Sequence, residues 1–163
     1  MRYLGAVILL LVFIIGYIMA NGYNTAIASY TENAPILDVI YALESSSGTN
    51  KKAYVENEVG ALGGYQIRRS TYKDIQRINK DRWGKIDFET VAGDDRLSRL
   101  AANDYVNWIE KYYTDRDISP SVENILLGYH SGVGNVRKGN IGKEGKNYIK
   151  RAHDIMFPGE RVE

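Results

Sequence analysis

Glu44 is the carboxylate with the most distinctive setting in this chain of 163 residues. It ends a short apolar run and is followed by Ser-Ser-Ser-Gly at positions 45–48. A carboxyl group half in the core and half in a cleft is partly desolvated, which raises its pKa. A carboxyl group that keeps its proton near neutral pH can act as a general acid. The alternative is a solvated glutamate near a helix end, and Glu44 alone does not decide between them.

Three later segments carry residues that could complete a site around this carboxylate. They read VGALGGYQI at 59–67, GYHSGVGNV at 128–136 and GKNYIKRA at 145–152. Glycines allow close approach of the backbone to a ligand, and they equally form plain turns. Tyr129 and Tyr148 can offer hydroxyl groups to a ligand or an acid, or can pack as core residues.

The composition limits the classes of function that the chain can have. A net charge of +1 gives no reason to expect a nucleic-acid partner. The absence of cysteine excludes disulfides, cysteine-ligated zinc and a thiol nucleophile. The two histidines, His130 and His153, lack the spacing of metal ligands, so we do not expect them to bind a metal.

The amino terminus differs from the rest of the chain. Residues 3–20 are uncharged and apolar, and as a helix they would extend roughly 27 Å, close to a bilayer core of roughly 30 Å. We therefore expect a membrane anchor. The alternative is a signal peptide cleaved after Ala28, although the apolar region of such a peptide is usually about 7–15 residues. A polar linker follows at 21–32.

Apolar periodicity predicts a mainly α domain over residues 33–157, followed by a tail at 158–163. The first helix has Pro35 in its first turn and stops at 45–48. Further helices are expected over 65–80, 97–112, from Ser119-Pro120 onward, and over 147–156. Residues 49–64 and 128–145 are predicted as loops, and 81–95 as irregular. The strongest helix signal is the stripe of Leu97, Leu100, Ala101, Tyr105, Trp108 and Tyr112.

Together these segments resemble the lytic transglycosylase family, in its soluble-lytic-transglycosylase-like domain of the lysozyme-like superfamily. ALESSSG at 42–48 is similar to the family's Glu-Ser segment. The second segment resembles V-G-A-x-G-L-M-Q-I, with Gly64 and Tyr65 in place of Leu and Met. The third resembles A-Y-N-A-G-x-G-x-V, with His130 in place of Asn. Tyr148 stands where the family has a late tyrosine, without its preceding Glu-Thr pair.

The resemblance implies a lysozyme-like, two-lobed domain that cleaves the β-1,4 bond between N-acetylmuramic acid and N-acetylglucosamine in peptidoglycan. Glu44 would be the single catalytic residue, acting first as acid and then as base, and would leave 1,6-anhydromuramic acid ends. This implied reaction needs neither a metal nor a cofactor. The resemblance also implies substrate-binding roles for eight residues: Ser45, Gly63, Gly64, Tyr65, Gln66, Tyr129, His130 and Tyr148. Ser45 has the alternative role of capping its helix. His130 alters the detail of substrate recognition rather than the reaction class.

Three alternative functions remain open at this point. A hydrolytic lysozyme would need a second carboxylate, for which Glu58 is the foremost candidate because it adjoins the turn at Gly60. Glu56, Asp87 and Glu89 are the others. A non-catalytic peptidoglycan-binding protein of an envelope complex or of a membrane-containing virion is the second alternative. A membrane-tethered helical adaptor is the third, and it does not explain the ordered segments.

The expected anchor and the expected reaction together predict a location. The catalytic domain would face the periplasm or cell wall, or lie in a virion membrane, and would be secreted if the chain is cleaved after Ala28. A linker of this length reaches roughly 45 Å when fully extended. Such a tether suits local wall opening during secretion or pilus assembly, or during phage genome entry. The expected partners are glycan strands, the membrane through residues 3–20, and proteins of a secretion apparatus or virion.

Overall fold

A computed structural model describes residues 33–159 of the chain. These residues fall within one compact unit that begins at Asn33. The predicted anchor at 3–20, the cleavage site after Ala28, the linker at 21–32 and the last residues of the tail lie outside the described part. No helix in the described part is both long enough and apolar enough to cross a membrane.

The described residues form eight α-helices, one short 3-10 helix and a two-stranded antiparallel sheet, which confirms the prediction of a mainly helical domain. The order is α2 (Ala34–Ser45), η1 (Lys51–Tyr54), β1 (Ala61–Leu62), β2 (Ile67–Arg68), α3 (Arg69–Ile78), α4 (Lys80–Trp83), α5 (Phe88–Gly93), α6 (Asp95–Thr114), α7 (Val122–Ser131), α8 (Val133–Arg137) and α9 (Gly142–Met156).

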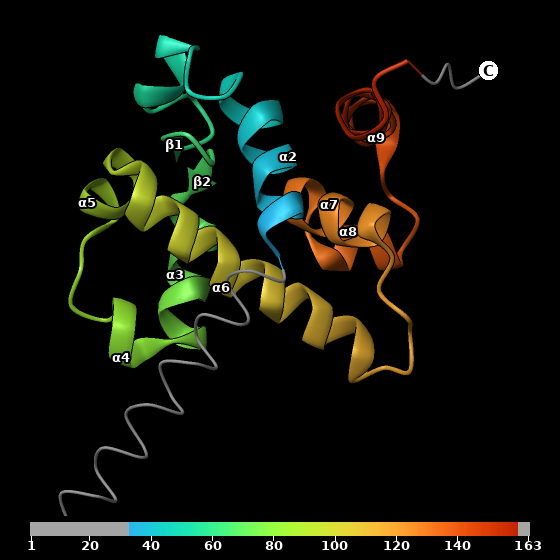
Figure 1. Ribbon diagram of the computed structural model, residues 1–163. Coiled ribbons are helices and arrows are strands. Elements are labelled where there is room, and N and C mark those ends of the chain that lie inside the picture. The colour runs from blue at the N-terminus through green and yellow to red at the C-terminus, as the bar shows by residue number, and fades with distance from the viewer. Residues whose placement is uncertain (1–32, 160–163) are drawn as a thin grey trace, which may run out of the picture. The chain divides into compact units, whose positions relative to one another are not determined.

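The long helix α6 is the element around which the others are arranged (Figure 1). Helices α3 and α5 pack against it on one side and α7 packs against it on the other, while α2 contacts α6, α7 and α9. Its first turn is capped by Asp94, whose carboxylate accepts backbone hydrogen bonds from Arg96 and Leu97. The predicted stripe from Leu97 to Tyr112 is therefore confirmed as a helix.

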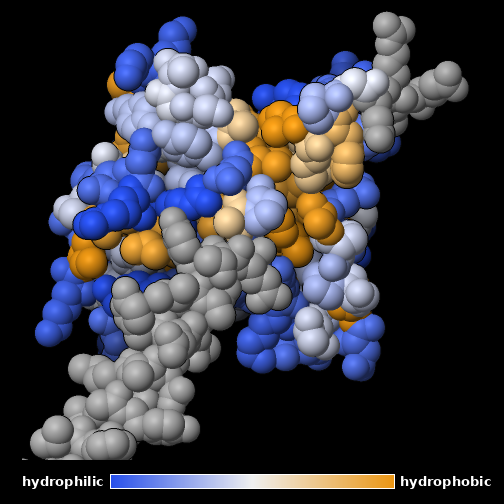
Figure 2. Space-filling model, viewed as in Figure 1, coloured by the Kyte–Doolittle hydropathy of each residue, from blue (hydrophilic) through white to orange (hydrophobic). Residues whose placement is uncertain are grey.

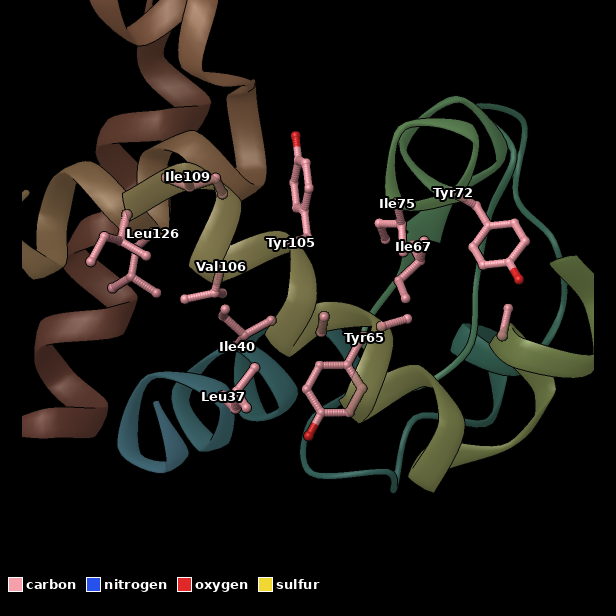
Figure 3. Close-up of a cluster of buried hydrophobic side chains, with 14 of the residues drawn as sticks. Leu37, Ile40, Tyr65, Ile67, Tyr72, Ile75, Tyr105, Val106, Ile109 and Leu126 are labelled. Atoms are coloured by element: carbon pink, nitrogen blue, oxygen red, sulfur yellow. The ribbon is translucent and has the colours of Figure 1, made fainter. Parts of the chain in front are cut away.

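The hydrophobic core is continuous along α6. Figure 3 shows Leu37 and Ile40 of α2 near Val106 of α6, and both α2 residues are fully buried. Ile109 and Leu126 extend the core toward α7, and a group around β2 and α3 extends it in the other direction: Ile67, Tyr72 and Ile75. Burial of this apolar surface is the main favourable contribution to folding, and it holds α2 against α6 and α7.

The end of α2 follows the sequence prediction closely. Ser45 is fully buried; its hydroxyl donates to the backbone oxygen of Tyr41 and accepts from the backbone N–H of Gly48. Ser46, Ser47 and Gly48 all adopt positive φ angles, of 52°, 55° and 78°. This left-handed backbone cannot continue a helix, so α2 stops one residue after Glu44.

The predicted helix over 65–80 is wrong at its amino-terminal end. Gln66 has a positive φ of 45°, and the chain there reverses between β1 and β2 before α3 begins at Arg69. Gly63 allows this turn to pack tightly, since a Cβ atom there would lie 1.9 Å from the backbone oxygen of Ala92. Helical spacing of apolar residues did not reveal the turn, because the turn depends on this tertiary contact.

Several short helices also differ from the prediction. Residues 81–95, expected to be irregular, contain part of α4 and all of α5, whose first turns are capped by Asn79 and Asp87. Helix α7 is capped by Ser121 rather than by Ser119-Pro120. The expected loop at 128–145 contains the end of α7, all of α8 and the start of α9. Helices of four to six residues present too few turns for an apolar period to be visible.

One face of the molecule displays uneven polarity. Hydrophobic residues gather at the surface over α2 and α7 (Figure 2). The surface of α3 carries an exposed ion pair between Arg77 and Asp74.

Candidate active site

A cleft of about 200 Å³ opens beside Glu44. Its lining comes from four parts of the chain that are distant in sequence: the end of α2, the segment from 57 to 71, α6, and the end of α7. The lining residues are Glu44, Asn57, Val59, Ala61, Gln66, Ile67, Arg68, Ser70, Thr71, Tyr105, Tyr129, His130, Ser131 and Gly132. Within residues 33–159, Glu44 is the only carboxylate that lines this cleft.

Glu44 accepts a hydrogen bond of 2.9 Å from the hydroxyl of Tyr148, which is 1% exposed on α9. Burial raises the pKa of Glu44 to about 7, against the opposing effects of the Tyr148 hydrogen bond and of the positive charges on Arg151 and Arg68. Protonated and ionised forms of Glu44 therefore coexist near neutral pH. A carboxyl group with this pKa can donate a proton and take one back.

The ring of Tyr148, whose hydroxyl binds Glu44, is also packed against His130. The two rings stack with centroids 4.2 Å apart and an interplanar angle of 15°. Burial and the neighbouring Glu44 keep the pKa of Tyr148 well above its ordinary value, so its hydroxyl remains a hydrogen-bond donor. Burial lowers the pKa of His130, with further lowering by Arg68 and Arg151, so its imidazole is neutral at pH 7.

Tyr129 lines the cleft and also contacts two other residues beside it, Tyr65 and Tyr105. Its hydroxyl donates to the backbone oxygen of Tyr65 at 2.9 Å, and its ring meets that of Tyr105 edge to face, with centroids 5.8 Å apart. Burial raises the pKa of Tyr129 well above its ordinary value, and the charge of Glu44 adds to that effect. Tyr129 thus joins the turn at Tyr65 to α7, and its hydroxyl is engaged by the protein itself.

Gln66 lines the cleft, but its side-chain amide forms its hydrogen bonds with other residues of the protein. The nitrogen donates to the backbone oxygens of Ala53 and Gly63 at 2.8 and 3.0 Å, and the oxygen accepts from Asn57. These three bonds hold the strained φ of Gln66 and fix the shape of the wall.

Gly63, Gly64 and Tyr65 do not line the cleft, contrary to the role that the resemblance implied. A Cβ atom at Gly64 would lie 2.4 Å from the ring of Tyr41, so this glycine faces α2 rather than the cleft. The ring of Tyr65 is 2% exposed and its hydroxyl accepts from Arg99. The three residues pack behind the wall, because the turn at Gln66 points them into the protein.

Ser45 follows its alternative role. Both of its hydrogen bonds end α2, and it lies outside the cleft lining.

The four candidates for a second carboxylate also lie outside that lining. Glu56 and Glu89 both pair with Arg69 at 2.6 Å. The carboxylate of Asp87 caps α5 through the backbone N–H and the hydroxyl of Thr90. Glu58 is exposed in the turn before β1.

Two site residues were not singled out from the sequence. Arg68 belongs to β2, lines the cleft and acts on both Glu44 and His130 through its charge. Asn57 also lines the cleft. Its side-chain oxygen accepts hydrogen bonds from the backbone N–H groups of Val59 and Ala61, which fixes the turn before β1. The alternation of Gln66 and Arg68 around the buried Ile67 is a strand signal that would have indicated Arg68.

No three histidine, aspartate or glutamate side chains between residues 33 and 159 come together as the ligands of a metal ion would. Searches of protein-family models, of curated proteins and of solved structures found no match to this chain.

Proposed function

We propose that this protein is a peptidoglycan lytic transglycosylase with Glu44 as its single catalytic residue. The observation that carries the proposal is a lone, partly buried carboxyl group in a cleft, with a pKa of about 7 and a buried tyrosine hydroxyl to orient it. Residues from the four segments that resemble this family lie near one another, which supports the proposal: Glu44, Gln66 and Tyr129 line the cleft, and Tyr148 donates a hydrogen bond to Glu44. A mainly helical domain with a cleft beside Glu44 is compatible with a lysozyme-like fold.

The reaction begins with protonated Glu44. It donates its proton to the glycosidic oxygen while the bond from that oxygen to the anomeric carbon of N-acetylmuramic acid breaks. The resulting positive charge is shared between the ring oxygen and the sugar's own N-acetyl group. Glu44, now ionised, accepts the proton of the muramic acid 6-hydroxyl as that oxygen bonds to the anomeric carbon. Glu44 ends protonated, and the product carries a 1,6-anhydro ring.

The hydrolytic alternative needs a second group to position water or to form a covalent intermediate. The placement of Glu56, Glu58, Asp87 and Glu89 outside the cleft lining favours the transglycosylase over this alternative. A membrane tether would limit cutting to the wall near the membrane, which suits local opening for a secretion apparatus, a pilus or an entering phage genome.

The test is mass spectrometry of the fragments that the full chain, in detergent, releases from purified peptidoglycan. We expect muropeptides with 1,6-anhydro ends, one water lighter than hydrolytic products, and no such products from Glu44→Gln. Hydrated reducing ends would instead make the protein a lysozyme. If the folded wild-type protein releases nothing, the proposal is wrong and a non-catalytic binding role gains support.

A further inference from the structure

A second hollow adjoins the cleft on the side of α9. It measures about 550 Å³ and is lined by His130, Glu144, Asn147, Lys150, Arg151 and Asp154. We call it the α9 groove. His130 lines both the groove and the cleft, so the two hollows are neighbours. Arg151 lies 5.8 Å from the centre of the Tyr148 ring, and the hydroxyl of Tyr148 donates to Glu44, so the groove is close to the proposed catalytic carboxylate.

The groove carries charges of both signs that form no salt bridge within residues 33–159. Glu144, Asn147, Arg151 and Asp154 follow one another at spacings of three, four and three residues, so they form one stripe on α9. No salt bridge joins Glu144, Lys150, Arg151 or Asp154 to another residue in the described part of the chain. The guanidinium of Arg151 is instead positioned 5.8 Å above the ring of Tyr148.

A ligand with charges of both signs would complement this lining, and a ligand bound in the cleft would reach the groove past His130, which lines both hollows. Peptidoglycan has such a part. Each muramic acid bears, on the ring carbon two positions from the anomeric carbon, a lactyl group extended by a short peptide with free carboxylates and amino groups. A glycan whose anomeric carbon is at Glu44 would direct this peptide out of the cleft within a few ångströms of the reacting bond.

We propose that the α9 groove binds the stem peptide of the muramic acid that is being cleaved. This inference rests on the proposed function and names the substrate class of that site. Arg151 and Lys150 bind peptide carboxylates, Glu144 and Asp154 face the peptide's amino group, and Asn147 is available to its backbone. The enzyme therefore prefers peptide-bearing glycan to glycan strands from which the peptides have been removed.

The experiment compares kcat/KM of the full chain in detergent on two substrates: peptidoglycan with its peptides, and the same glycan after removal of the peptides by an amidase. We expect wild type to favour the peptide-bearing substrate by about tenfold or more, since only that substrate can form charge-assisted hydrogen bonds with the groove. Arg151→Gln should bring this ratio close to one. Any effect that Arg151 exerts through Glu44 acts on both substrates and cancels in the ratio.

Two further variants keep the test decisive. Lys150→Gln combined with Asp154→Asn removes one charge of each sign, leaves the net charge unaltered, and should also lower the ratio. Arg77→Gln removes a guanidinium from the exposed surface of α3 and should leave the ratio at the wild-type value. A wild-type ratio near one, or equal ratios in all variants, overturns the inference while leaving the proposed function in place. Failure of wild type on both substrates overturns the proposed function itself.

Binding gives a readout that does not depend on turnover. Isothermal titration of the inactive Glu44→Gln chain with a peptide-bearing disaccharide and with the bare disaccharide should show tighter binding of the former. Adding Arg151→Gln should weaken the peptide-bearing ligand about tenfold and leave the bare one unaltered. Equal affinities for the two ligands would contradict a peptide site in this groove.

Discussion

Replacing Glu44 by Gln should stabilise the fold at high pH, although it removes the proposed catalytic group. The pKa of Glu44 is about 7 in the folded protein against an ordinary value of 4.5, because burial disfavours the charged form. A raised pKa means that the folded state binds the proton more tightly than the unfolded state. The stability from this extra proton is fully present below pH 4.5 and is lost as pH rises through 7.

The magnitude follows from the same two values. A difference of about 2.5 in pKa corresponds to about 3 kcal/mol at 1.36 kcal/mol per unit, which is an upper bound because Glu44 is only partly buried by surface area. Glutamine has the shape of glutamate, retains an oxygen to accept the Tyr148 hydrogen bond, and does not titrate. Glu44→Gln should therefore match wild type near pH 4 and exceed its free energy of unfolding by about 1–3 kcal/mol at pH 8.

The assay is urea denaturation of both proteins at intervals between pH 4 and pH 8.5, with the difference in unfolding free energy plotted against pH. Glu58→Gln, which removes an exposed carboxylate, serves as the matched control and should show no such rise. A difference between Glu44→Gln and wild type that is constant across this range would refute the reasoning, because Glu44 would then have the same pKa in both states.

Three further predictions concern the residues around Glu44. Tyr148→Phe removes the hydrogen bond that lowers the pKa of Glu44, so the fall of kcat/KM at alkaline pH should move upward by about one pH unit; an unaltered pH profile would contradict this. Tyr129→Phe breaks the bond to the Tyr65 backbone and should lower both the melting temperature and kcat, by about 1–3 kcal/mol in stability; loss of activity at an unchanged melting temperature would instead point to direct contact with substrate. Gly63→Ala should destabilise the domain by more than about 2 kcal/mol, as seen by thermal denaturation, since its φ is 83° and the new Cβ would collide with Ala92; a neutral result would show that the turn relaxes easily.

The features that the sequence predicted correctly are mostly set by residues that are close to one another along the chain. The stop after Glu44 could be predicted because serines are poor residues for a helix interior and Gly48 readily adopts left-handed backbone, whereas the positive φ angles of Ser46 and Ser47 could not. The extent of α6 could be predicted because twenty residues give more than five turns in which an apolar stripe is visible. Tyr129 and His130 line the cleft as expected, since they lie in the last turn of α7, a helix that packs against α6.

Only the tertiary structure decided which residues of the segment from 63 to 68 line the cleft. Gly63, Gly64 and Tyr65 are adjacent to Gln66 in sequence, yet they pack into the protein, whereas Gln66 and Arg68 line the cleft. This conformation is stabilised by contacts with Ala53, Ala92 and Tyr41, all of which are remote in the sequence.

The sequence by itself determined the mainly helical fold and the position of Glu44 at a helix end. It could not determine that carboxyl group's pKa, which depends on burial and on Tyr148, Arg151 and Arg68 from two other elements. Neither could it show that α9 lies against α2 and adds a charged groove beside the cleft. Helix propensity and capping are set by neighbours within a few residues, whereas desolvation and electrostatic interactions depend on distance in space.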